Sequence, residues 1–217
     1  MGSVLSLNVG RGRPGAPRYG TTGIDKRPVA AITVRDPGSR DEGGGSGVEG
    51  DFVGDGENHG GSSQAVYVFA REELDRWQRE LGRPLAAGAF GENVTTTAID
   101  VDGALIGERW RIGPTAEFVV TGPRIPCATF ALHIGAPRWA EQFSSHGRTG
   151  AYLAVAVPGT LRTGDEIVVV DRPAHGLDVV ALFGALRGDR DLAERILTEC
   201  RPHPVVRAAL ERRLARR

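Results

Sequence analysis

The chain has 217 residues, with 27 basic and 27 acidic side chains, so its formal net charge at pH 7 is zero. Balanced charge gives no bulk attraction to nucleic acid or to an anionic membrane surface, and we predict neither as a partner. No apolar run approaches the roughly 18–20 residues that span a bilayer. The start of the chain lacks the basic and apolar regions of a signal peptide. Two cysteines exclude a disulfide framework, and we therefore expect a cytoplasmic protein.

Short apolar segments alternate with glycine- and proline-rich stretches in the first part of the chain. Residues 11–22 are expected to be irregular, and residues 36–50, rich in Gly, Ser, Asp and Glu, are expected to form a mobile loop that cannot pack a core. The spacing of apolar residues changes to that of a helix at residues 71–81. Leu74 and Trp77 share one face of this predicted helix, which stops at Gly82. Strands are expected at residues 4–9, 29–34 and 65–69.

More strands follow in the middle of the chain. A hairpin is predicted from residues 101–112 and 116–121 around the turn Gly113-Pro114, and further strands at residues 151–157 and 166–170. Several strands at short spacing, with one or two helices among them, indicate a mainly β domain of the α+β class with a barrel-like sheet over residues 1–172.

Residues 173–217 predict a different structure, a small tail of three helices. Asp178 is placed as the N-cap of a helix over residues 178–186, and Gly188 ends it. A second helix is expected over residues 189–200, and Pro204 is well placed to open a third.

Cys127 stands out because it directly follows Pro123-Arg124-Ile125-Pro126, just after an apolar run. Proline cannot extend a central strand, so these residues predict a stiff corner at a strand end. The positive charge of Arg124 should lower the pKa of the Cys127 thiol, and the thiolate is the form that binds metals or attacks electrophiles. The alternative is a small buried hydrophobic cysteine, and we interpret Cys200 in that way.

Four segments, in this order, resemble the MOSC domain family, which is named after the C-terminal domain of molybdenum cofactor sulfurase. They are Gly23-Ile24-Asp25-Lys26-Arg27-Pro28-Val29, Gly50-Asp51 followed by His59-Gly60-Gly61, Phe90-Gly91-Glu92-Asn93-Val94-Thr95, and Pro123-Arg124-Ile125-Pro126-Cys127. The resemblance covers about residues 4–170 and implies a β-barrel with peripheral helices. The tail is similar to the three-helix extension of a subgroup that includes proteins reducing N-hydroxylaminopurines.

This resemblance implies that the chain binds the molybdenum cofactor, a metal held by the dithiolene of a phosphorylated pterin. Cys127 would be the metal ligand, since thiolate is a soft donor. Cations would hold the phosphate, and backbone groups and side chains would contact the pterin. The predicted cofactor contacts are Lys26, Arg27, His59, Gly60, Gly61, Gly91, Asn93 and Arg124. The predicted proton donor is His59 or Glu92.

The function implied by the resemblance is reduction of N-hydroxylated compounds such as hydroxylaminopurines, hydroxylamines and amidoximes, by N–O bond cleavage. The sequence has no flavin, haem or iron–sulfur motif, so electrons are expected from a separate reductase that binds transiently. Two alternatives stay open: a carrier in which Cys127 holds a persulfide or stored cofactor, and a barrel that has lost its cofactor and acts as a scaffold. The oligomeric state is also open, with a dimer as one option.

Structural roles compete with several of these assignments. His59 can be a capping or core histidine, Glu92 and Asn93 can cap a loop backbone, and Lys26 can be a solvated turn residue. A zinc site is disfavoured because the five histidines are dispersed and no Cys-x-x-Cys is present. Pyridoxal phosphate is disfavoured because Lys26 is the only lysine and no partner for a pyridine nitrogen is evident. The single His59 also departs from the paired histidine of many relatives.

Overall fold

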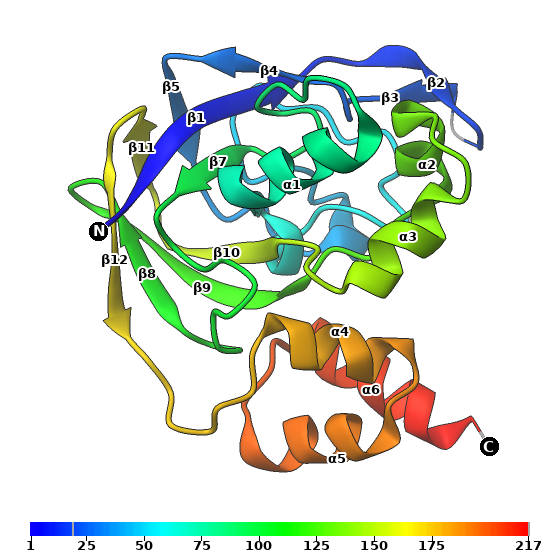
Figure 1. Cartoon of the computed structure of the whole chain (residues 1–217). Helices are drawn as coiled ribbons and strands as arrows, with labels where there is room; N and C mark the ends of the chain where they lie inside the picture. Colours follow the sequence, from blue (N-terminus) through cyan, green and yellow to red (C-terminus); the bar gives the residue numbers. More distant parts are fainter. Residues whose placement is uncertain (19, 217) are drawn as a thin grey trace.

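Seven strands close into a barrel in the computed structural model, which describes residues 1–18 and 20–216 (Figure 1). Their order is β12-β8-β9-β10-β6-β7-β1, and β1 pairs with β12 to close the sheet. All neighbours are antiparallel except β6 and β7, which are parallel. The mainly β barrel predicted from the sequence is confirmed. The strands are β1 (Gly2–Gly10), β6 (Val66–Ala70), β7 (Val94–Thr97), β8 (Arg109–Ile112), β9 (Ala116–Pro123), β10 (Ala151–Val157) and β12 (Glu166–Asp171).

Five further strands lie outside this barrel. An outer strand, β4 (Lys26–Val29), pairs with β1; β5 (Ala31–Val34) pairs with β11 (Gly159–Arg162); and β2 (Arg13–Ala16) pairs with β3 (Gly20–Thr22). The predicted single strand at residues 29–34 is therefore two strands with different partners. The segment expected to be irregular contains a hairpin, and residues 101–108 form turns before the short β8.

The loop at residues 36–50 has a defined structure, so the prediction that it cannot pack a core was wrong. It contains a short 3-10 helix, η1 (Arg40–Glu42), and Val48, which is 2% exposed and forms a β-bridge with Val34. A composition poor in apolar residues hid the one apolar side chain that anchors the loop.

Strand β6 is buried on both faces, which explains its continuous apolar sequence. Val66 and Val68 point into the barrel core, while Tyr67 and Phe69 point outward into an aromatic layer. Three helices cover that layer: α1 (Arg71–Leu81), α2 (Ala128–Ile134) and α3 (Trp139–His146). The sequence predicted only α1, because α2 and α3 are too short to show a clear helical period.

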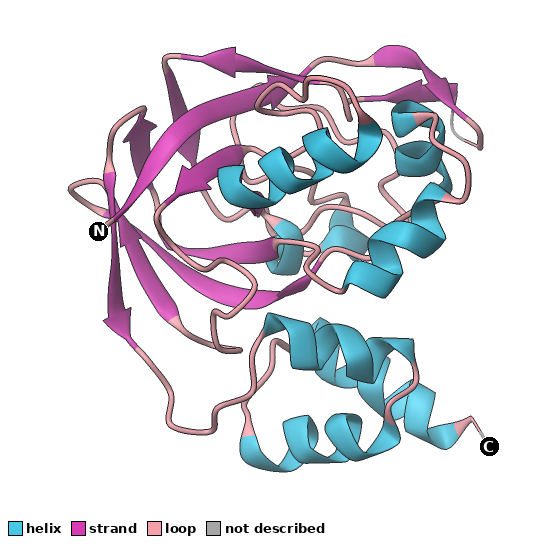
Figure 2. Cartoon of the chain, in the orientation of Figure 1, coloured by secondary structure: helices cyan, strands magenta, loops and turns pink. Residues whose placement is uncertain are grey.

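The tail consists of α4 (Val179–Arg187), α5 (Arg190–Glu199) and α6 (Pro204–Ala215), gathered beside the barrel (Figure 2). As predicted, the Asp178 carboxylate caps α4 by accepting a hydrogen bond of 2.7 Å from the backbone N–H of Ala181. The helices share an apolar core that also includes Ile106 from the barrel, and Leu182 of α4 packs against Gly122 of β9. The division into two domains at residue 172 stays a prediction.

Candidate functional site

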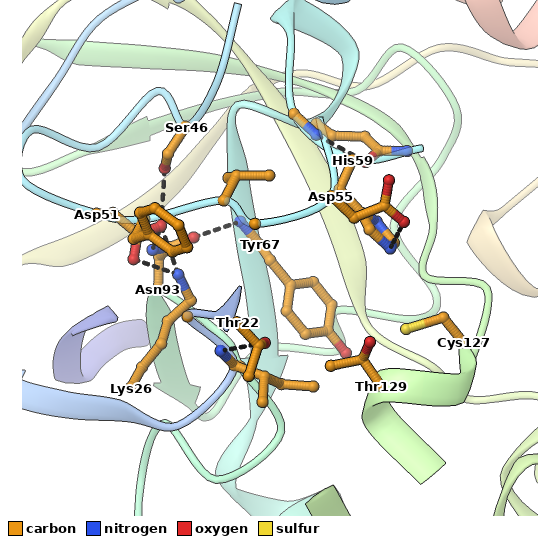
Figure 3. Close-up of a pocket in the computed structure, with 18 of the residues that line it drawn as sticks. Thr22, Lys26, Ser46, Asp51, Asp55, His59, Tyr67, Asn93, Cys127 and Thr129 are labelled. Atoms are coloured by element: carbon orange, nitrogen blue, oxygen red, sulfur yellow. Dashed lines mark hydrogen bonds and ion pairs between the residues drawn. The ribbon is translucent and has the colours of Figure 1, made fainter. Parts of the chain in front are cut away.

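One pocket gathers most of the residues that the sequence motifs singled out. It is open to solvent and has a volume of about 110 Å³. Figure 3 shows its side chains: Cys127, His59, Asp55 and Thr129 lie at one end, and Lys26, Asp51, Ser46 and Asn93 at the other, with the Tyr67 ring between them.

Cys127 reaches the pocket because β9 ends at Pro123 and the chain turns through Pro126 into α2. The residue occupies the N-cap position of this helix, and its thiol is partly exposed. Burial alone would raise the pKa of the Cys127 thiol. A hydrogen bond with His59, the charge of Arg124 and the backbone N–H of Phe130 outweigh burial and lower the pKa to about 7. The thiolate fraction at neutral pH is therefore larger than that of an ordinary cysteine.

His59 lies beside this thiol on a turn that starts at Asp55. The backbone N–H of His59 donates to the carbonyl oxygen of Asp55 at 3.0 Å. The Asp55 carboxylate is also 4.0 Å from the imidazole Nε2, so it is placed to orient the ring. The sequence analysis missed Asp55; its position four residues before His59 was the available signal.

Arg124 lies beneath the pocket and is 6% exposed. One guanidinium nitrogen donates to the carbonyl oxygen of Phe90 at 2.7 Å, and the guanidinium carbon lies 4.9 Å and 4.4 Å from the ring centroids of Tyr67 and Phe130. Its buried Nε has no hydrogen-bond partner among the described residues. This arginine thus combines a fixed position with a free donor.

The other end of the pocket is built around a buried ion pair between Lys26 and Asp51. The side chains are 8% and 1% exposed. Asp51 also accepts hydrogen bonds from the backbone N–H of Gly10 at 2.7 Å, from Ser46 at 2.8 Å and from Asn93 at 3.0 Å. Burial lowers the pKa of Lys26, against the opposing effect of Asp51. We call these residues the Asp51 network; it connects β1, β4, the loop at residues 36–50 and Asn93, which directly precedes β7.

This network gives Lys26 and Asn93 structural roles that the sequence did not reveal. The Asn93 amide donates to Asp51 and to the carbonyl oxygen of Asn8, and its oxygen accepts from the backbone N–H of Tyr67. Both residues line the pocket, but their polar groups are largely engaged by the protein. Their role as cofactor contacts stays a prediction.

Glu92 does not line the pocket. Its side chain is fully buried, and its carboxylate accepts hydrogen bonds from the backbone N–H groups of Gly88 and Phe90 and from the hydroxyl of Thr95. Glu92 therefore shapes the loop that carries Gly91, and the geometry favours His59 over Glu92 as the proton donor.

Two other predicted contacts lie away from the pocket lining, while two glycines belong to it. Arg27 is 64% exposed and pairs with Asp25 at 2.7 Å, because β4 alternates its side chains and directs Lys26 inward. Gly61 packs against Arg40 instead. Gly60 and Gly91 do line the pocket, and both have positive φ values that favour glycine.

The residues of the Cys127 end fit the metal-bearing part of a molybdenum cofactor. A thiolate is available in a pocket, and a buried arginine N–H without a partner lies beneath it. The predicted phosphate cluster of Lys26, Arg27 and Arg124 is not assembled, since Lys26 is paired with Asp51 and Arg27 is directed to solvent. Within residues 1–18 and 20–216, no group of three or more His, Cys, Asp or Glu side chains is arranged to hold a bare metal ion.

Aromatic and hydroxyl residues complete the pocket. Tyr67 and Tyr152 have ring centroids 5.1 Å apart, and Phe52, Thr22 and Thr129 also line it. No local sequence pattern marks them as pocket residues, because they come from five separate segments. In the described part of the chain, no helix has both the length and the apolar character needed to cross a membrane.

Comparisons with known proteins agree with this architecture. The MOSC domain family model matches residues 55–168. The "Uncharacterized protein YflK" of Bacillus subtilis is 33% identical over 183 residues, covering 82% of this chain and 77% of that protein. A "Reductase" of Gibberella moniliformis is 27% identical over 150 residues, covering 68% of this chain but only 27% of that longer protein. The crystal structure of YiiM from Geobacillus stearothermophilus matches with a TM-score of 0.77 and 26% identity, covering 99% of this chain and 100% of that one.

The matched segment includes more than half of the chain and both His59 and Cys127. The barrel, the peripheral helices and the three-helix tail also extend over the full length of the matched YiiM structure. The chain therefore belongs to the MOSC domain family, whose domain binds the molybdenum cofactor.

Proposed function

We propose that this protein is an oxidoreductase that uses the molybdenum cofactor to reduce N-hydroxylated compounds. The observation that carries the proposal is the Cys127 thiol, which opens into the pocket with its pKa lowered to about 7. The match to a protein named "Reductase" supports the same class of chemistry. The overall reaction takes R–NHOH, two electrons and two protons, and gives R–NH₂ and water.

The cofactor would supply two-electron redox chemistry, and the protein would supply position and protons. Cys127 would hold the metal as a thiolate. Arg124 would place a fixed positive charge beneath the site and keep the thiol ionised. His59, oriented by Asp55, would deliver a proton to the departing oxygen, since an imidazole exchanges protons near neutral pH. The electrons would come from a separate reductase.

The lining of the pocket supports this substrate class. Tyr67, Tyr152 and Phe52 offer flat apolar surfaces, and Thr22 and Thr129 offer hydroxyl groups. Such a lining suits a flat N-heterocycle with polar edges, and we propose hydroxylaminopurines first, with hydroxylamines and amidoximes as smaller members of the same class.

The test begins with the metal. The wild type and the variants C127A and C200A would be produced in a host that makes molybdenum cofactor, and molybdenum measured by elemental mass spectrometry. Cys200 is the matched control, because it is 4% exposed in the tail. We expect near-stoichiometric metal in the wild type and C200A, and little in C127A. Hydroxylaminopurine reduction with reduced methyl viologen would follow, and a wild type without metal would refute the proposal.

A second candidate is a carrier of cofactor or sulfur, favoured by the same lowered thiol pKa because a thiolate also accepts a persulfide sulfur. The two functions differ in turnover. A metal-loaded wild type that reduces none of the three substrate classes, and transfers its cofactor or sulfur to an acceptor protein, would support the carrier.

A further inference from the structure

The zero net charge of the chain conceals a strong separation of charge. Residues 173–217 contain nine of the 27 basic residues and six of the 27 acidic ones, so the tail carries a formal charge of +3 and residues 1–172 carry −3. All nine basic residues in the tail are arginines. The tail is therefore a basic body attached to an acidic barrel.

Four of these arginines surround one groove at the end of the three-helix tail. Arg190 comes from the start of α5, Arg212 and Arg213 from the last turn of α6, and Arg216 from the C-cap position directly after it. The groove has a volume of about 650 Å³, and Leu186 and Ala209 contribute an apolar floor. All four arginines are exposed.

Among the described residues, none of these four arginines has a carboxylate partner, in contrast to Arg195 and Arg207. Arg195 pairs with Glu199 at 2.8 Å and Arg207 with Glu211 at 3.7 Å. Among the residues that the structure describes, no carboxylate lies within 4.0 Å of the charged groups around the groove; Arg190 contacts only the carbonyl oxygen of Leu214, at 3.2 Å. Compensation of the α6 C-terminus accounts for part of this cluster, including the hydrogen bond from Arg190 to the last turn. It gives none of the four arginines a carboxylate partner.

The tail also contacts segments that carry site residues. Leu182 of α4 packs on Gly122, two residues before Arg124 on the same chain segment. His203 and Val205, at the start of α6, line a cavity with Gly61 and Ser62, directly after the His59 turn. Helix α4 and the start of α6 thus connect the tail to the segments that support the pocket, and the arginine groove lies at the other end of α6.

We propose that the arginine groove docks the electron-donating partner, a redox protein with an acidic surface. This inference rests on the proposed function, because that reaction needs two electrons from another protein. The exposed arginines would attract the acidic surface of the partner, orient it as it approaches and raise the association rate.

The features of the groove favour a protein over a nucleic acid as the occupant. A nucleic acid extends along its binding surface, and the adjoining barrel, with its net charge of −3, would repel a long polyanion. The apolar floor of Leu186 and Ala209 instead matches the mixed apolar and polar character of protein interfaces.

The experiment compares two electron donors on the metal-loaded enzyme: reduced methyl viologen, which needs no docking surface, and a reduced plant-type [2Fe–2S] ferredoxin chosen for its acidic surface. The variant is R190E/R212E/R213E, with R190Q/R212Q/R213Q as a milder form in case charge reversal disturbs folding. The matched control is R79E/R111E/R162E, three exposed barrel arginines that also lack a carboxylate partner among the described residues.

We expect the groove reversal to lower ferredoxin-driven turnover by about tenfold or more, with viologen-driven turnover unchanged and the control equal to the wild type. Binding of ferredoxin to the wild type should weaken between about 0.01 and 0.15 M salt, over which the Debye length falls from about 30 to about 8 Å.

Two results would overturn the docking site while viologen-driven turnover still supports the function. One is ferredoxin-driven turnover that neither groove variant changes; the other is ferredoxin binding to the wild type that is absent or insensitive to salt. Groove-dependent binding of duplex DNA in place of ferredoxin would assign the groove to nucleic acid. If the wild type shows no turnover with viologen, the proposed function is refuted, and the docking role with it.

Discussion

Replacing Asp51 by Asn should destabilise the protein strongly, although Asp51 lies in the candidate site. The carboxylate is 1% exposed and receives hydrogen bonds from four groups, one of them the buried ammonium of Lys26. Removing one partner of a buried ion pair costs about 3–5 kcal/mol. The upper limit follows from Lys26: making a lysine of ordinary pKa 10.4 neutral at pH 7 requires about 4.6 kcal/mol. We expect D51N to lose about 3–4 kcal/mol of unfolding free energy.

The pH dependence of this loss identifies its cause. Without Asp51, burial should lower the pKa of Lys26 further in the folded state, below its unfolded value near 10.4. The unfolded chain then binds more protons than the folded chain, so the stability of D51N should rise as pH increases from 7 towards 10. The difference from the wild type should shrink over the same range.

Urea unfolding of the wild type, D51N and D25N at pH 7 and pH 9.5 would measure both effects. Asp25 is the matched control, because it pairs with Arg13 and Arg27 at the surface, where such pairs are worth about 0–1 kcal/mol. A loss below about 1 kcal/mol for D51N, or a loss that does not change with pH, would refute a structural role for the Asp51 network and return Lys26 to the cofactor-binding residues.

Three further results are expected. The rate of Cys127 alkylation by iodoacetamide should be half-maximal near pH 7, and H59Q should move the midpoint towards the ordinary value of about 8.5; a wild-type midpoint above 8 would contradict the thiolate. Burial raises the pKa of Asp102 to about 6, so the folded state binds this proton more tightly, and stability should fall by up to about 3 kcal/mol as pH rises from about 4 to 6. Thermal unfolding of D102N should lack that fall, and an unchanged profile would exclude this group as its source. D178A should cost about 1 kcal/mol by removing the α4 cap, measured by urea unfolding, and a neutral effect would show that the cap is dispensable.

The sequence predicted those elements in which apolar residues recur at a regular spacing over several turns, or which end at a clear stop residue. Helix α1 begins and ends at the predicted residues because Leu74 and Trp77 recur on one face and Gly82 adopts the left-handed conformation. The tail helices followed from Asp178, Gly188 and Pro204 in the same way. Short elements failed, since α2 and α3 have too few turns to show a period, and the aromatic layer around Phe143 that stabilises them is assembled from distant segments.

The candidate site was predicted less completely, for a related reason. Local sequence marked Cys127, because two prolines define its corner without help from the rest of the chain. The state of Lys26 depends on Asp51, which lies 25 residues away, and the state of Asn93 depends on backbone groups from β1 and β6. A motif indicates which residues matter, whereas hydrogen bonds across the fold decide whether their polar groups remain available.

That distinction divides the pocket into two functional parts. At the Asp51 end, donors and acceptors satisfy one another, and their strength maintains the shape of the pocket. At the Cys127 end, three groups remain able to bind a ligand: a thiol with a lowered pKa, a histidine 4.0 Å from its carboxylate, and an arginine Nε without a partner among the described residues. Buried polar capacity that the protein itself leaves unused is costly, so a ligand that supplies the missing partners stabilises the folded state. Metal-loaded protein should accordingly unfold at a higher temperature than metal-free protein, and C127A should abolish that difference while leaving the Asp51 network intact.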